Sequence, residues 1–156
     1  MKLQNVFFIM LIGLFVSCGG KEKKVPSYGK SAVKKEVVEK VDNTKPSLDN
    51  KGIGPIKSLK LEAINDALVT KGKALYKTNC TACHKFSKRY IGPGLKGVTE
   101  RRSPEWIMNL ILNTEEMLAK DPVAKALIAE YNAPMANQQL SEEDARAILE
   151  YFRTKN

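Results

Sequence analysis

The stretch Cys80-Thr81-Ala82-Cys83-His84 carries most of what this sequence says about fold and function. It places two thiols three residues apart and an imidazole directly after the second thiol. The 156-residue chain holds 3 cysteines and 1 histidine in all. By itself it therefore builds neither a zinc site from four cysteines nor any site that needs two histidines. The odd number of cysteines also excludes a complete disulfide framework.

The spacing Cys-x-x-Cys-His is the attachment signature of c-type haem. Two thiols at this spacing, on a turn that enters a helix, reach the two vinyl groups of one porphyrin, and the adjacent histidine is held under the iron. A thioredoxin-like redox pair would be expected in a βαβ unit, whereas the segment before Cys80 has a helical pattern. A zinc site would need a fourth ligand. We predict one haem c, bound covalently through Cys80 and Cys83, with His84 as an axial ligand.

The other axial position is open to methionine, to lysine or to no protein ligand, because a single histidine excludes bis-histidine ligation within the monomer. Met108 lies in an apolar helical run and Met117 lies beside Leu118, which are positions typical of core methionines. Met135 follows Pro134 in a loop before the last helix, where the backbone can aim a thioether without kinking a helix. We predict that Met135 is the second axial ligand.

The residues around the motif have the periodicity of helices, and no stretch alternates convincingly with period two. A helix is expected from about residue 61 to residue 77. Three further helix starts are marked by capping residues: Ser103-Pro104-Glu105, Asp121-Pro122 and Ser141-Glu142-Glu143-Asp144. We expect a small all-α domain over residues 59–156, built around the haem.

From Ala67 to its end, over about 90 residues, the chain resembles bacterial class I monohaem cytochromes c. Besides the haem motif, the residues that match are Gly72 and Tyr76, the loop Gly92-Pro93-x-Leu95, the pair Pro134-Met135, and Tyr151. The resemblance implies a helical shell around one haem with an exposed edge. It also implies that the Pro93 carbonyl accepts a hydrogen bond from the proximal imidazole, and that an aromatic residue of the last helix packs on the first.

Residues 1–17 are predicted to be a signal peptide. Lys2 precedes an apolar run from Val6 to Val16, which is too short to span a bilayer but suits a secretory signal. The stretch Leu14-Phe15-Val16-Ser17-Cys18 resembles a bacterial lipobox, whose cysteine becomes lipidated. The alternative is a buried first helix, which an all-round apolar run followed by a charged tract disfavours. We expect an exported lipoprotein, anchored to the membrane through Cys18 and facing the periplasm.

Residues 18–58 are predicted to be a lipidated N-terminus followed by a disordered, flexible tether. From residue 19 onward this stretch holds ten lysines and five acidic residues, with few large apolar groups. Such a composition cannot bury enough surface to offset the entropy of ordering. A flexible chain of about 40 residues has a root-mean-square span on the order of 35 Å, which would let one haem move between membrane partners.

These features favour an electron carrier. A six-coordinate haem with histidine and methionine ligands has no vacant iron position, so it neither binds nor activates a substrate. The predicted donor is a membrane quinol-oxidising complex, and the predicted acceptor is a terminal oxidase or reductase. The alternative is a five-coordinate haem enzyme or gas sensor, such as a peroxidase, for which no second histidine remains as a distal acid–base group.

The charge of the chain bears on its partners. The formal net charge is +9, but the predicted domain from residue 59 carries only +3, so no nucleic-acid role is indicated. Lys85, Lys88, Arg89 and Lys96 flank the haem motif and are a candidate basic rim for docking an acidic redox protein. The alternative interpretation of these cations is a solvated face.

Overall fold

The computed structural model describes residue 42 and residues 45–156. The predicted signal peptide, Cys18 and most of the predicted tether lie outside these residues. The regular elements of the described part are helices: α2 (Asp66–Asn79), α3 (Val98–Arg101), α4 (Pro104–Leu112), α5 (Thr114–Lys120), α6 (Pro122–Tyr131) and α7 (Glu142–Arg153). The predicted all-α fold is confirmed. None of the described helices is long and apolar enough to cross a bilayer.

Helix boundaries follow the capping residues. The side chains of Ser103, Asp121 and Ser141 each accept a hydrogen bond from a backbone N–H in the first turn of the helix that follows. The first helix was expected from about residue 61, but it starts at residue 66 because the Asn65 side chain accepts from the Leu68 N–H. Helices α3 and α5 have no side-chain cap, and the sequence did not predict them.

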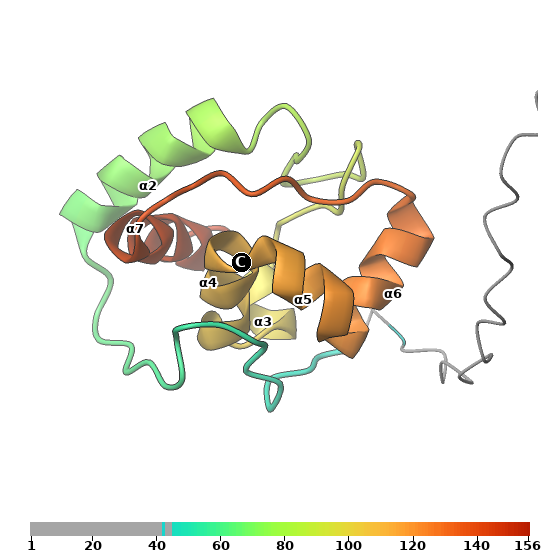
Figure 1. Cartoon of the computed structure of the whole chain (residues 1–156). Helices are drawn as coiled ribbons and strands as arrows, with labels where there is room; N and C mark the ends of the chain where they lie inside the picture. Colours follow the sequence, from blue (N-terminus) through green and yellow to red (C-terminus); the bar gives the residue numbers. More distant parts are fainter. Residues whose placement is uncertain (1–41, 43–44) are drawn as a thin grey trace, which may run out of the picture. The chain divides into compact units, whose positions relative to one another are not determined.

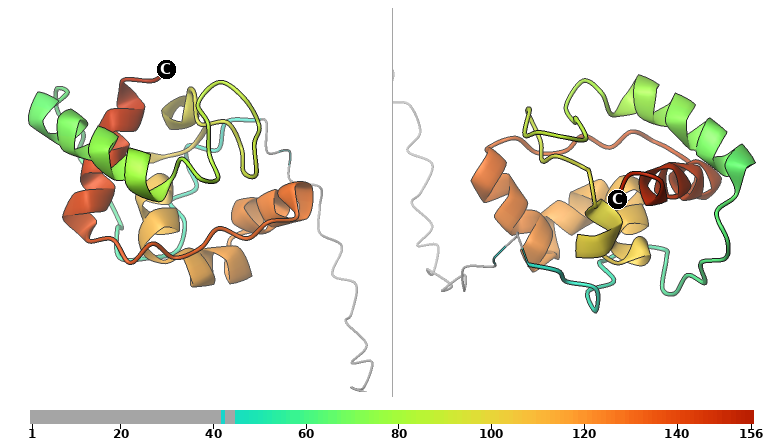
Figure 2. Two further views of the ribbon diagram at one scale, coloured as in Figure 1. Left: turned by 90° about the horizontal axis from the view of Figure 1, so that it is seen from above. Right: turned by 180° about the vertical axis from the view of Figure 1, so that it is seen from behind.

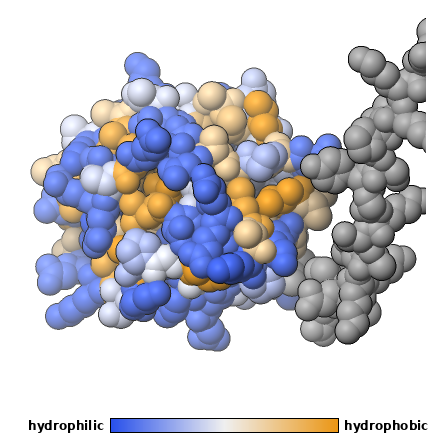
Figure 3. Space-filling view, in the orientation of Figure 1, coloured by the Kyte–Doolittle hydropathy of each residue, from blue (hydrophilic) through white to orange (hydrophobic). Residues whose placement is uncertain are grey.

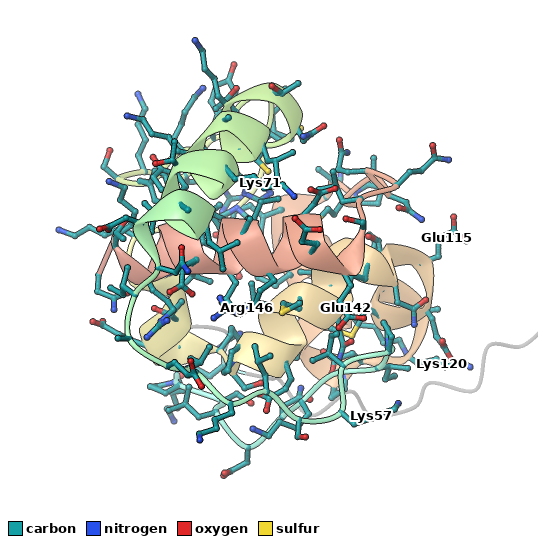
Figure 4. All side chains as sticks on the ribbon, turned by 90° about the vertical axis from the view of Figure 1, so that its left-hand side faces the viewer. Lys57, Lys71, Glu115, Lys120, Glu142 and Arg146 are labelled. Carbon is teal, nitrogen blue, oxygen red and sulfur yellow. The ribbon has the colours of Figure 1, made fainter. Side chains whose placement is uncertain are left out.

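Helices α2 and α7 cross in close contact, as Figures 1 and 2 show. Gly72 allows this approach, since a Cβ atom at that position would lie 1.9 Å from the carbonyl oxygen of Ala147. At the edge of the crossing, Lys71 forms ion pairs with Glu143 at 2.6 Å and with Asp144 at 2.9 Å; Figure 4 labels Lys71 on α2. The first and last helices thus form one packed unit.

Four aromatic rings join this crossing to the haem motif. The Tyr76 ring lies 4.8 Å from Phe86 and 5.7 Å from Tyr151, between ring centroids, and Phe152 packs on both Tyr76 and Phe86. The Tyr76 hydroxyl donates a hydrogen bond to the carbonyl oxygen of His84 at 3.0 Å. The helix crossing and the motif are therefore positioned together, with Tyr151 packed against α2 as the resemblance implied.

The buried carboxylate of Glu150 links α7 to the N-terminal end of α2. Glu150 on α7 is fully buried and accepts hydrogen bonds from Arg146, from Arg153 and from the backbone N–H of Asn65. Burial by itself raises the pKa of Glu150, but these hydrogen bonds lower it below its ordinary value. Glu150 therefore remains ionised in the folded protein at neutral pH.

Residues 45–59, which we call the strap, run in an extended course along α3, α4 and α5 (Figures 1 and 2). The Asn109 side chain on α4 is 1% exposed. It donates to the carbonyl oxygens of Lys51 at 2.9 Å and Ile56 at 2.8 Å, and it accepts from the Ile56 N–H at 2.9 Å. The Leu59 N–H donates to Glu105, which also pairs with Lys51. Side chains of α4 thus provide the hydrogen-bond partners that a neighbouring strand would otherwise supply to the backbone of the strap.

The predicted tether extended to residue 58, and the strap differs from that prediction. Its backbone groups bond to side chains of α4, to Asn113 and to the sulfur of Met117, and its Ile56 is buried in the core. Composition does not report such pairing. Lys57 projects outward from the strap in Figure 4, and Lys45 and Lys51 are exposed as well. Figure 3, in the orientation of Figure 1, shows hydrophilic residues over much of the visible face, with hydrophobic residues exposed between them.

Candidate haem site

The motif lies on a turn that ends α2. The Cys80 N–H bonds to the Tyr76 carbonyl, and both Cys83 and His84 donate their backbone N–H to the Cys80 carbonyl, at 3.1 and 2.8 Å. The Gly92 N–H donates to the Cys83 carbonyl at 2.9 Å, which folds the following loop back over the motif. These backbone hydrogen bonds fix the course of the chain segment that carries the two sulfur atoms and the imidazole.

His84 is oriented by this loop. Its Nδ1 lies 3.0 Å from the carbonyl oxygen of Pro93. A carbonyl oxygen only accepts, so Nδ1 carries the proton and Nε2 keeps its lone pair for a metal. Gly92 leaves room for the ring, since a Cβ atom there would lie 2.5 Å from the His84 Cε1 atom. The contact that the resemblance implied between His84 and Pro93 is present in the structure.

Two adjoining cavities, of about 310 and 160 Å³, lie against the motif. Cys80, His84 and Met135 line both, and Cys83 lines the smaller one. Most of the remaining lining is aliphatic or aromatic, from α4, α6 and the loop before α7. The structure thus brings the five site residues predicted within the described part to one largely apolar space: Cys80, Cys83, His84, Pro93 and Met135.

The structure separates the three described methionines that competed for the second axial position. Met135 lines both cavities. Met108 is 1% exposed and Met117 is 0% exposed, and neither lines the cavities. The sulfur of Met117 accepts the Ile53 N–H at 2.9 Å and so holds the strap. Of these three methionines, only Met135 lines the cavities that His84 also lines.

Cys80 does not have the environment of a reactive redox thiol. Burial, and secondarily Cys83, raises the pKa of the Cys80 thiol to about 11. Catalytic thiols are activated by the opposite shift, towards thiolate. An uncharged thioether is well suited to this apolar position, so the chemistry of the sulfur pair fits covalent haem. Within the described residues, no cluster of three or more histidine, cysteine or acidic side chains could hold a metal ion.

Two arginines that line the larger cavity were not predicted from the sequence to belong to the site. Arg101 donates to the carbonyl oxygens of Lys96 and Gly94, and Arg102 donates to those of Lys45 and Arg101. Arg102 is 5% exposed, and burial lowers its pKa. Such guanidinium groups would form charge-assisted hydrogen bonds with the carboxylates of a bound haem. No local pattern distinguishes them, because they reach the cavity through the fold of α3.

Residues 69–155, more than half of the chain, match the family model for cytochrome c. The chain belongs to the cytochrome c family. A cytochrome c-553-like protein of Synechocystis sp. is 39% identical over 85 residues, which is 54% of this chain and 66% of that relative. The structure of cytochrome c from Rhodothermus marinus is 49% identical, covers 65% of this chain and 88% of its own, and superposes with a TM-score of 0.63.

An engineered form of the Rhodothermus marinus protein, bound to a carbene intermediate, is 48% identical with a TM-score of 0.60; it covers 65% of this chain and 88% of its own. Membership of the family means that the protein carries one covalently bound haem c and transfers electrons. Cys80 and Cys83 fit the attachment motif.

Proposed function

We propose that the protein transfers electrons through a six-coordinate haem whose iron is bound by His84 and Met135. The observation that carries this proposal is that both side chains line the same cavities, while the Pro93 carbonyl fixes the imidazole with its Nε2 lone pair available. Bound haem supplies a one-electron couple, and methionine ligation and burial both favour the ferrous state. Cys80 and Cys83 hold the porphyrin, and Arg101 and Arg102 neutralise its propionates.

The proposed partners are redox proteins that dock at the haem edge, a quinol-oxidising complex as donor and a terminal oxidase or reductase as acceptor. Lys88 and Lys96 are exposed beside the motif and are suited to steer an acidic surface. Lys85 is held by the Thr81 carbonyl and the Tyr90 ring, so it contributes charge from a fixed position. Tyr90 and its neighbour Ile91 are about half exposed, which provides apolar contact within the charged rim.

The proposed location is the periplasmic face of a membrane, with Cys18 carrying the lipid. Cys18 lies outside the described residues, so this proposal is supported by the sequence pattern alone. Its test is Cys18→Ser, for which we expect loss of lipidation and release from the membrane fraction, or a block in signal processing. An unchanged mass and membrane distribution would refute the anchor while leaving the haem proposal intact.

The ligand proposal is tested by alanine substitution of three methionines in the holoprotein. Met135→Ala should abolish the long-wavelength absorption band from the bond between iron and methionine sulfur, and should lower the reduction potential. Met108→Ala and Met117→Ala are matched controls that should keep the band and lose about 2–5 kcal/mol of unfolding free energy. If Met135→Ala kept both band and potential, Met135 would not be the ligand. A high-spin wild-type spectrum would instead favour a five-coordinate haem enzyme or gas sensor.

A further inference from the structure

Arg89 connects the two sides of the haem cavity. It lies in the loop after His84, and its guanidinium carbon lies 4.2 Å from the centroid of the Tyr131 ring on α6. One guanidinium nitrogen donates to the carbonyl oxygen of Glu130 at 3.0 Å, and another lies 3.9 Å from the Glu130 carboxylate. Glu130 and Tyr131 both line the larger cavity, and Tyr131 lines the smaller one as well. We call these three residues the clasp.

The residues of the clasp lie close in sequence to both proposed axial ligands. Arg89 follows His84 by five residues, and Glu130 precedes Met135 by five residues. The clasp therefore joins the segment that carries the proximal ligand to the segment that carries the distal one. Its α6 partners are the last two residues of the helix, directly before the loop that holds Met135.

That loop has little other polar support. Among the described residues, the hydrogen bonds made by residues 133–139 stay within the loop, from the Gln138 side chain to the Ala136 carbonyl and from the Gln139 N–H to Asn137. Met135 itself packs against the apolar core. The placement of the loop thus depends on apolar packing and on its two ends, and the clasp holds the end at α6.

We propose that Arg89 is a positioning residue that keeps Met135 on the haem iron by holding the end of α6 against the loop of His84. The proposal rests on the proposed ligation by Met135. For that sulfur to leave the iron, the loop after α6 must move, and the clasp resists this movement. The ion pair is half exposed and contributes little. The hydrogen bond to the Glu130 carbonyl and the stacking on Tyr131 supply most of the resistance.

The experiment measures binding of imidazole to the ferric holoprotein at about pH 8, where this probe is neutral and indifferent to surface charge. Imidazole binds when methionine leaves, so its rate and affinity report how often the sixth position opens. Arg89→Gln should raise both roughly tenfold, since it removes one hydrogen bond and one cation–ring contact. Arg89→Lys keeps the charge without the planar stacking, and should lie between Arg89→Gln and the wild type.

The matched control is Lys88→Gln, which removes the same charge from the neighbouring position. Lys88 is exposed and makes no hydrogen bond or ion pair with any residue in the described part of the chain. Its imidazole rate should stay within twofold of the wild type, and urea unfolding of all variants separates a loss of global stability from a local opening.

The outcomes separate the two proposals. A rate increase in Arg89→Gln that Lys88→Gln lacks, at a nearly unchanged unfolding midpoint, supports the clasp. An Arg89→Gln rate within twofold of the wild type, or an equal increase in Lys88→Gln, overturns it while methionine ligation stands. A wild-type ferric spectrum without the sulfur–iron band overturns the ligation proposal, and the clasp with it.

Discussion

Replacing Asn109 by alanine should detach the strap from α4 and lower the free energy of unfolding by about 3 kcal/mol. The Asn109 side chain satisfies the carbonyl groups of Lys51 and Ile56 and the N–H of Ile56, all at 2.8–2.9 Å. A buried backbone group that loses its partner costs about 1–3 kcal/mol. Both Ile56 groups are buried, whereas the Lys51 carbonyl can be rehydrated. Two groups therefore count, and the expected loss of about 3 kcal/mol lies in the lower half of their summed range of about 2–6 kcal/mol.

The assay combines urea unfolding of the holoprotein, followed by helical circular dichroism, with limited trypsin digestion. Lys51 and Lys57 are exposed side chains on the strap, and their peptide bonds should resist cleavage in the wild type and become sensitive in Asn109→Ala. Asn113→Ala is the graded control, because Asn113 donates to a single strap carbonyl, that of Ile53, and should cost about 1 kcal/mol.

Two results would refute this reasoning. Rapid wild-type cleavage after Lys51 and Lys57 would mean that the strap is not held in solution. A change in unfolding free energy below about 0.5 kcal/mol for Asn109→Ala, with cleavage unchanged, would mean that its three hydrogen bonds contribute nothing net relative to hydration.

Three further predictions concern the rest of the domain. Gly72→Ala should cost about 3 kcal/mol or more in urea unfolding, because its Cβ atom would overlap the Ala147 carbonyl and force α2 and α7 apart. The pKa of Glu150 is raised by burial but lowered overall by its hydrogen bonds, below its ordinary value of 4.5. Its stabilisation is therefore complete above pH 4.5 and is lost as pH falls through the folded pKa, and Glu150→Gln should flatten this acid dependence of unfolding free energy. Asp121→Ala removes both the cap of α6 and the acceptor of the buried Trp106 indole N–H, and should lower the thermal midpoint through a loss of about 2–4 kcal/mol.

Local patterns accounted for the starts of three capped helices, α4, α6 and α7. Ser103, Asp121 and Ser141 each bind a backbone N–H within three residues, so the signal and its partner lie together in the sequence. Helices α3 and α5 lack such caps and went unpredicted. Their formation depends on packing against distant segments, which no short window of sequence contains.

The ordering of the strap is likewise a feature that a short window of sequence does not predict. Lysines, prolines and glycines make up seven of its fifteen residues, a composition typical of a linker. Its hydrogen-bond partners include side chains of α4 and Asn113, the residue between α4 and α5, more than 40 residues further along the chain. Pairing between a backbone and distant side chains leaves no periodicity in either segment.

In the haem site, too, some features follow from local sequence and others depend on tertiary packing. The motif from Cys80 to His84 determined the cofactor by itself, because both thiols and the imidazole must act from one turn and are therefore adjacent in sequence. The sequence also predicted Met135 as the second axial ligand, and in the structure it lines the same cavity as His84. Only the tertiary structure showed that Met117 bonds to the strap and that Arg89 stacks on Tyr131. Those relations join segments tens of residues apart. Their physical basis is tertiary packing, of α6 and its loop across the cavity and of α5 against the strap, rather than any preference of the residues themselves.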